Sequence, residues 1–158
     1  RTPHLDANCR GVFFGLSSMH TTADMARAVM EGISYSLTDC NDIIREMGIN
    51  VTEMMACGGG AKNGVQRQMM ADIYQAEIRV PNYLEEATSM GAAILAGIGA
   101  GVFKDFSVID RFVRIEQTVQ PIQENVKKYE AWMPVFDKAY HALCDMYTEI
   151  AKTELDSI

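Results

Sequence analysis

The feature that most constrains this chain is a run of three glycines, Gly58 to Gly60, between a short apolar stretch and a helical pattern. Residues 51–57 predict a short buried strand that ends at the glycines, and residues 64–74 predict a helix with Val65, Met69 and Ile73 on one face. Glycine lacks a Cβ, so its backbone can adopt positive φ and leave room for another molecule. A strand, a glycine turn and a helix therefore indicate a backbone that approaches a ligand, with the first N–H groups of the helix directed at it.

The turn matches neither of the two common phosphate-binding loops. A dinucleotide fingerprint would need a glycine where Asn63 stands and an acidic residue where Val80-Pro81 ends the next strand. A P-loop would need Lys and Ser or Thr after Gly64, but Val and Gln follow it. Turn chemistry by itself leaves two roles open for the glycines, ligand binding and close packing.

Composition sets the class of protein. The chain has 158 residues, of which 48% are hydrophobic and 22% charged, so it can form a globular domain with a core. A formal net charge of −7 argues against a nucleic-acid partner, which would require a basic face. No apolar run reaches the length of a membrane span, and no signal peptide is visible, so no membrane partner is expected.

The cysteines and the first residue of the sequence also carry information. Because Cys9, Cys40, Cys57 and Cys144 form no C-x-x-C pair, we expect free, buried thiols in a cytoplasmic protein rather than a zinc site. The sequence begins with Arg1 rather than Met, from which we expect a piece of a longer protein.

The remaining periodicities predict further elements. Residues 11–16 predict a short strand or extended buried segment, and residues 24–47 a long amphipathic helix that is capped by Thr21 or Thr22 and stops at Gly48. Residues 77–80 predict a second strand, closed by Pro81 and parallel to the first. A third helix is expected after Glu85-Glu86, and its small residues 90–97 predict close packing against a neighbour.

The last third of the chain predicts a connector and a long helix. Residues 103–120 are expected to be a connector with Phe103, Phe106 and Phe112 as anchors. Apolar residues from Ile122 to Ile150 follow heptad-like steps, which favour a helix folded back on its own domain over a coiled coil with another chain. Pro134 predicts a kink or a restart near Met133.

Other polar residues suggest no catalytic centre. Arg27 and Glu31 stand four apart on a helix, which favours a surface ion pair over a ligand role. His4, His20 and His141 lack a local acid-and-nucleophile signature, so each is expected to be a surface or satisfied histidine.

Several motifs occur in an order that resembles a known family. They are Arg1–Asp6 with Arg10–Leu16, Ala26–Ile33, Cys57–Asn63 with Arg67–Asp72, and Ala87–Ala93. Together they resemble the FGGY carbohydrate kinases and, within them, the xylulokinase branch. The resemblance covers nearly the whole chain and is loose over the last helix.

The resemblance implies an α/β fold, the ribonuclease-H-like or actin-like ATPase fold, with two domains around a cleft. The chain would be the C-terminal half, an incomplete sheet flanked by helices. It would form a single C-terminal FGGY-type domain over residues 1–158. Residues 1–20 would be its leading segment and strand, 21–102 its nucleotide-binding core, and 103–158 its connector and C-terminal helices.

The resemblance also implies an activity, the transfer of the γ-phosphoryl of ATP, with Mg²⁺, to the 5-hydroxyl of D-xylulose. Gly58, Gly59, Gly60, Ala61 and Asn63 would line the adenosine site. The catalytic aspartate, the phosphate-binding hairpins and most sugar contacts would precede Arg1, so this chain would hold no catalytic or metal residue and would be inactive by itself. Related kinases for ribulose, gluconate or glycerol share this half.

The expected partners are the nucleotide, the sugar, an N-terminal kinase domain and, through exposed edges, a second copy of the chain. Two other classes of protein remain open. One is a non-catalytic actin-like scaffold or regulator that keeps the nucleotide turn. The other is a helical interaction module built on residues 122–150.

Overall fold

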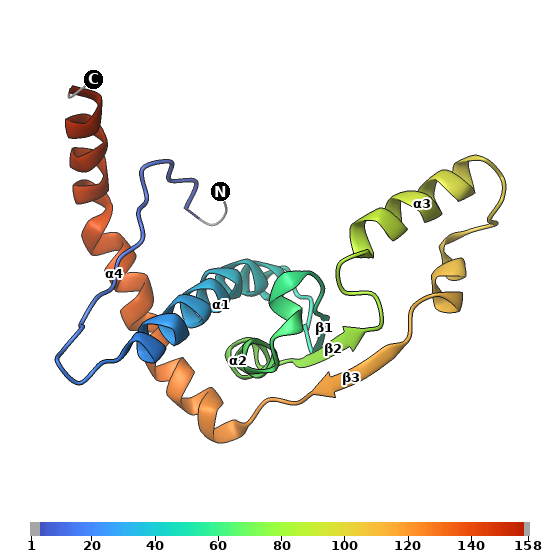
Figure 1. The fold of residues 1–158 in the computed structure, drawn as a ribbon, viewed down its shortest axis with the longest axis horizontal. Coiled ribbons are helices and arrows are strands. Elements are labelled where there is room, and N and C mark those ends of the chain that lie inside the picture. The colour runs from blue at the N-terminus through green and yellow to red at the C-terminus, as the bar shows by residue number, and fades with distance from the viewer. Residues whose placement is uncertain (1–3, 157–158) are drawn as a thin grey trace. The chain divides into compact units, whose positions relative to one another are not determined.

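A computed structural model describes residues 4–156 of the chain, and Figure 1 labels its helices and strands. Within these residues the chain forms two compact units: one contains the chain up to Ile49 and from Glu124 onward, and the other is Asn50–Gln123. The first three residues of the motif that opens the chain, Arg1 to Pro3, lie outside the described residues.

The first unit begins its regular structure with helix α1, Thr22–Glu46, as the apolar periodicity predicts. Asp24 accepts hydrogen bonds from the backbone N–H and the hydroxyl of Thr21, both at 2.7 Å, which fixes the start of the helix. Gly48 has φ +86° and its N–H donates to Arg45 O at 2.9 Å, so glycine ends the helix as expected.

The burial of α1 differs from what an amphipathic helix normally shows. Its apolar face is largely exposed within the described residues, with Ile33 at 56%, whereas Ser34 and Thr38 are buried. The two hydroxyls tolerate burial because Ser34 donates to Met30 O and Thr38 donates to Ser34 O, both at 3.1 Å. This exposed apolar face is a surface suited to contact with further polypeptide.

Helix α4, Gln123–Asp156, is one continuous helix that contains Pro134, so the predicted restart near Met133 is wrong. Proline removes one N–H donor, but in a helix of 34 residues the backbone hydrogen bonds of the neighbouring turns keep the helix continuous. The ring of Phe136 stacks on Tyr35 of α1 at 5.2 Å between centroids, and the Tyr35 hydroxyl donates to Tyr129 O at 3.2 Å. These contacts confirm that the last helix folds back on its own chain.

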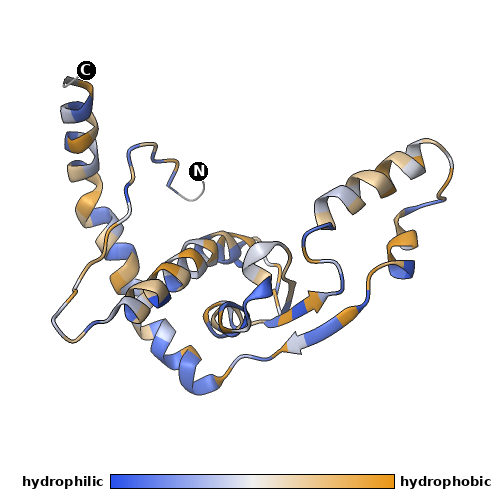
Figure 2. Ribbon diagram, viewed as in Figure 1, coloured by the Kyte–Doolittle hydropathy of each residue, from blue (hydrophilic) through white to orange (hydrophobic). Residues whose placement is uncertain are grey.

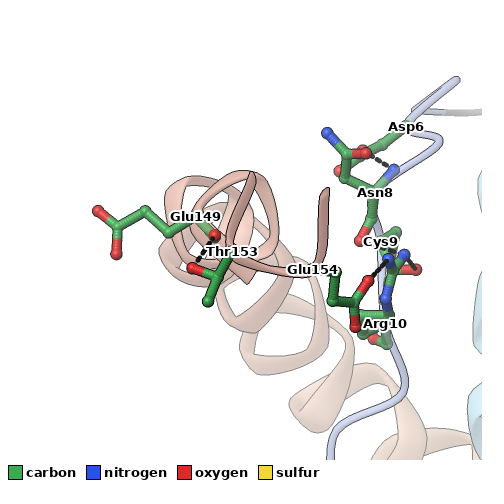
Figure 3. Close-up of polar contacts among 7 residues, drawn as sticks. All are labelled: Asp6, Asn8, Cys9, Arg10, Glu149, Thr153 and Glu154. Atoms are coloured by element: carbon green, nitrogen blue, oxygen red, sulfur yellow. Dashed lines mark hydrogen bonds and ion pairs between the residues drawn. The ribbon is translucent and has the colours of Figure 1, made fainter. Parts of the chain in front are cut away.

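The segment at residues 11–16 forms no strand, and its side chains are exposed, with Phe14 at 78%, so the predicted buried strand is wrong. The physical reason is that, in the described part of this unit, no strand runs beside the segment to pair with its N–H and C=O groups. Nearby residues are held by polar contacts (Figure 3): Arg10 pairs with Glu154 of α4 at 3.2 Å and donates to Asn8 O at 2.8 Å.

The second unit contains a three-stranded sheet in the order β1-β2-β3. Strands β1, Glu53–Met55, and β2, Glu77–Pro81, are parallel as predicted, with Met54 opposite Ile78. Strand β1 is shorter than residues 51–57 and is not buried, because among residues 4–156 a strand pairs with it on one side alone; Met55 is 54% exposed. Strand β2 lies in the centre and buries Ile78 and Val80.

Strand β3, Ile115–Val119, pairs antiparallel with β2, so the description of residues 103–120 as a connector is wrong. The strand is mostly exposed and carries little apolar alternation, so its residues give no strand signal in the sequence. A 3₁₀ helix, η2, Phe106–Arg111, precedes it, and its buried residue is Val108 rather than the expected Phe106, which is 63% exposed.

Helix α2, Gly64–Tyr74, has the predicted bounds. Met69 and Ile73 are buried, but Val65 is 53% exposed because it lies in the first turn beside the glycine bend, so the predicted apolar face is only partly right.

The small residues of helix α3, Ala87–Gly99, predict close packing, and this is wrong over most of its length: Ile94 is its buried residue, while Leu95 is 60% exposed. The helix is nevertheless coloured mainly as neutral to hydrophobic residues along its length (Figure 2). No described element covers its other faces, although they are apolar enough to pack. Gly97 is the exception, since a Cβ there would lie 2.5 Å from the ring of Phe103.

Two further findings concern the whole described chain. All four cysteines are free, but Cys9 and Cys57 are exposed, so the expectation of buried thiols is wrong for these two, both of which lie in irregular segments. Among residues 4–156, no helix combines the length and the apolar composition needed to cross a bilayer.

Candidate functional site

The glycine turn connects β1 to α2 and has the backbone geometry that its sequence predicts. Gly58 has φ +81° and ψ −173°, a region that is essentially restricted to glycine. A short 3₁₀ helix, η1, Gly59–Lys62, follows before α2 begins. The Gly58 N–H donates to Leu84 O at 2.6 Å, which ties the start of the turn to the loop after β2, and the Ala61 N–H donates to Gly58 O at 3.1 Å, which closes the turn internally.

The space beside the three glycines is open. A Cβ placed on Gly58, Gly59 or Gly60 would meet no described atom within 4 Å, and Gly59 and Gly60 are exposed. Close packing would require neighbouring atoms at these positions, so packing within the described residues does not explain why three glycines occur together. The arrangement instead leaves bare backbone facing open space, as a flat base and ribose would require.

Asn63 begins helix α2. Its side-chain oxygen accepts the N–H of Val65 at 2.9 Å, and its backbone oxygen accepts the N–H of Arg67 at 3.0 Å. The side chain is exposed on the same turn as the glycines. Ala61 differs from the other predicted site residues because it is 1% exposed, so its methyl group supports the turn from the interior of the unit.

Lys62 and Glu85 form an ion pair of 2.7 Å beside the turn, which the sequence does not predict. Both side chains are more than half exposed. Lys62 lies in a short 3₁₀ helix and Glu85 in a loop. The two residues are too far apart in the sequence for a local pattern to pair them, so the pair is evident only in the folded structure.

Asp72 holds helix α2 in place from inside the unit. Its carboxylate is 2% exposed and accepts the N–H of Ile122 at 2.7 Å and the side-chain amide of Gln68 at 2.8 Å. The same Gln68 amide donates to Gln120 O at 3.0 Å. Asp72 lies within the Arg67–Asp72 motif, but the sequence suggests no role for it, because its backbone partner, Ile122, is fifty residues away.

Other polar clusters lie in the first unit. Arg27 and Glu31 form the predicted ion pair at 2.8 Å, and the Tyr129 hydroxyl contacts both at 2.9 Å. Burial raises the pKa of Tyr129, and its hydrogen bond to Glu31 raises it further, so the hydroxyl stays neutral and links α4 to α1.

The histidines lie in exposed positions. The His4 ring stacks on Tyr140 at 3.6 Å between centroids and meets His141 at 5.9 Å. His20 Nδ1 accepts the backbone N–H of Ser17 at 2.9 Å and lies 3.1 Å from the Ser17 hydroxyl, which describes a local turn rather than an activated nucleophile.

The first unit also contains a groove of about 880 Å³ between residues 9–16, α1 and α4. Its walls are largely apolar and include Phe14, Ile33 and Trp132. Every residue that lines it belongs to this unit, and no residue of the glycine turn is among them.

Comparison of the fold with solved structures defines the class of protein. A ligand-bound xylulose kinase from Lactobacillus acidophilus matches with a TM-score of 0.81 and 29% identity, over 95% of this chain and 30% of that one. A gluconate kinase from the same organism matches with a TM-score of 0.79 and 30% identity, over 92% of this chain and 29% of that one. The fold is thus that of the C-terminal domain of sugar kinases, within the actin-like ATPase fold.

The sequence comparisons identify the family. Residues 1–100 match the C-terminal domain of the FGGY family of carbohydrate kinases, and the chain belongs to that family of phosphotransferases. A xylulose kinase from Staphylococcus epidermidis is 44% identical over 141 residues, which are 89% of this chain and 28% of that protein. A gluconokinase from Bacillus subtilis is 35% identical over 152 residues, 96% of this chain and 29% of that protein. The chain therefore spans less than a third of the length of these curated relatives.

Proposed function

We propose that this chain supplies the adenosine-binding side of an ATP-dependent ketopentose kinase, which converts D-xylulose to D-xylulose 5-phosphate. The observation that carries the proposal is the open glycine bend, where bare backbone at Gly58, Gly59 and Gly60 borders space that no described side chain fills. The likeness to xylulose kinases supports the choice of sugar.

Each residue of the turn would have a distinct role toward the nucleotide. The backbones of the three glycines would lie against the base and ribose, and Asn63 would offer its amide at the start of α2. Ala61, which is buried, would support the turn from below. Phosphoryl transfer depends mainly on positioning and charge neutralisation, so this part of the protein would contribute by holding the adenosine end of ATP in a fixed place.

ATP would bring Mg²⁺ on its phosphates, and we assign no ligand for that ion to this chain. The phosphate contacts, the sugar contacts and the base that takes the hydroxyl proton would come from an N-terminal kinase domain. We further propose that the enzyme is cytoplasmic and that the exposed apolar face of α1 favours self-association when that domain is absent.

A kinase assay on the complete gene product tests this function. We expect ATP-dependent phosphorylation with the highest kcat/KM for D-xylulose among D-xylulose, D-ribulose, gluconate and glycerol, and no turnover by the 158-residue chain in isolation. Gluconate is the sharpest competitor, because a gluconokinase matches this chain nearly as well as the xylulose kinases do. Preference for gluconate would reassign the substrate, and nucleotide binding without turnover of any sugar would indicate a scaffold instead.

A further inference from the structure

We propose that the ion pair between Lys62 and Glu85 is a positioning clamp, which sets the opening of the glycine turn and thereby the affinity for the nucleotide. The inference rests on the proposed nucleotide site and adds two residues to it. Lys62 ends η1, and Glu85 stands just before α3, with their charged atoms 2.7 Å apart.

The ion pair lies beside a second link between the same two segments. The Gly58 N–H donates to Leu84 O at 2.6 Å, one residue before Glu85. The turn is therefore joined to the loop after β2 at both of its ends, by the backbone bond at Gly58 and by the side-chain pair at Lys62.

The loop after β2 is itself fixed at its other end. Asn82 donates its backbone N–H to Arg114 O and its side-chain amide to Phe112 O, and its side-chain oxygen accepts the Arg114 N–H, all at 3.0 Å. Asn82 is thus anchored to the residues just before β3. The loop therefore holds the turn at Gly58 and at Lys62 from an anchored position. Loss of the Glu85 contact would let the glycine turn shift relative to this anchored loop.

A clamp and a direct charge effect predict different changes in nucleotide affinity when one of the two charged side chains is removed. If the charges acted directly on the anionic nucleotide, removing Lys62 would weaken binding and removing Glu85 would strengthen it. A clamp needs both partners, so either removal should weaken binding and exchanging the two charges should restore it. Since both side chains are exposed, the effect should be modest and should fade as salt screens the pair.

The test uses Lys62→Gln, Glu85→Gln and the exchanged double variant Lys62→Glu with Glu85→Lys in the complete gene product. We expect each single variant to raise the KM for ATP about three- to fivefold at low salt, with kcat and the KM for sugar unchanged. The double variant should return to within about twofold of the wild type, and 0.5 M salt should remove most of the difference.

Two further variants calibrate the result. Lys128→Gln breaks an ion pair of 2.6 Å with Glu124 on the exposed surface of α4 and should leave the KM for ATP unchanged. Asn63→Ala, within the proposed site, should raise that KM. Opposite shifts for the two single variants, or no shift while Asn63→Ala still acts, would overturn the clamp and leave the proposed function standing. If Asn63→Ala has no effect either, the nucleotide site itself is wrong.

Discussion

Replacing Asp72 by alanine should lower the free energy of unfolding by about 3 kcal/mol. The carboxylate is 2% exposed and accepts the backbone N–H of Ile122 at 2.7 Å and the Gln68 amide at 2.8 Å. Without it, the Ile122 N–H and the Gln68 side-chain amide lose a charged acceptor, and hydrogen bonds to charged groups stabilise more than neutral ones do. The change would also loosen α2, whose first turn carries the proposed nucleotide contact at Asn63.

Urea and thermal unfolding of the complete gene product measure this effect. Asp72→Asn, which keeps an oxygen acceptor, should cost about 1 kcal/mol. The matched control is Asp105→Ala, because Asp105 is exposed and accepts the Ser107 N–H at 3.0 Å, so its loss should cost about 0.5–1 kcal/mol. Equal costs for Asp72→Ala and Asp105→Ala would show that the buried carboxylate does not hold α2.

Replacing Gly58 by alanine should cost about 2 kcal/mol, because alanine at φ +81° and ψ −173° is strained however much space surrounds it. Gly59→Ala is the control, since it lies in η1 without a positive φ and its Cβ would meet nothing within 4 Å. It should leave stability nearly unchanged and raise the KM for ATP, since the added methyl group would occupy the space proposed for the nucleoside.

The two glycine variants therefore separate strain from binding. Stability is followed by thermal unfolding and nucleotide affinity by the KM for ATP, each in the complete gene product. A loss of stability in Gly59→Ala would mean that the bend is closed by atoms of the folded protein, and an unchanged KM for ATP in both variants would remove the turn from the nucleotide site.

Local chemistry was enough to predict the elements nearest the site. The bounds of α2, the positive φ of Gly58 and the glycine stop after α1 follow from periodicity and from the properties of glycine, which depend on few neighbours. The same is true of the pair formed by Arg27 and Glu31, since residues four apart on a helix meet wherever the helix packs.

Features that depend on distant partners were not predictable. Strand β3 exists because β2 pairs with it, not because its own residues alternate. The role of Asp72 depends on Ile122, fifty residues away, and the ion pair of Lys62 depends on a loop that only the fold brings near. The apolar face of α1 shows the converse, since its pattern predicts the helix correctly but not which residues are buried.

The structure of the complete gene product with bound ADP tests the central claim most directly. We expect the adenosine to lie within about 4 Å of the backbone of Gly59 and Gly60, with Asn63 at its edge. Adenosine bound elsewhere, with residues 58–63 left facing solvent, would contradict the assignment of this turn.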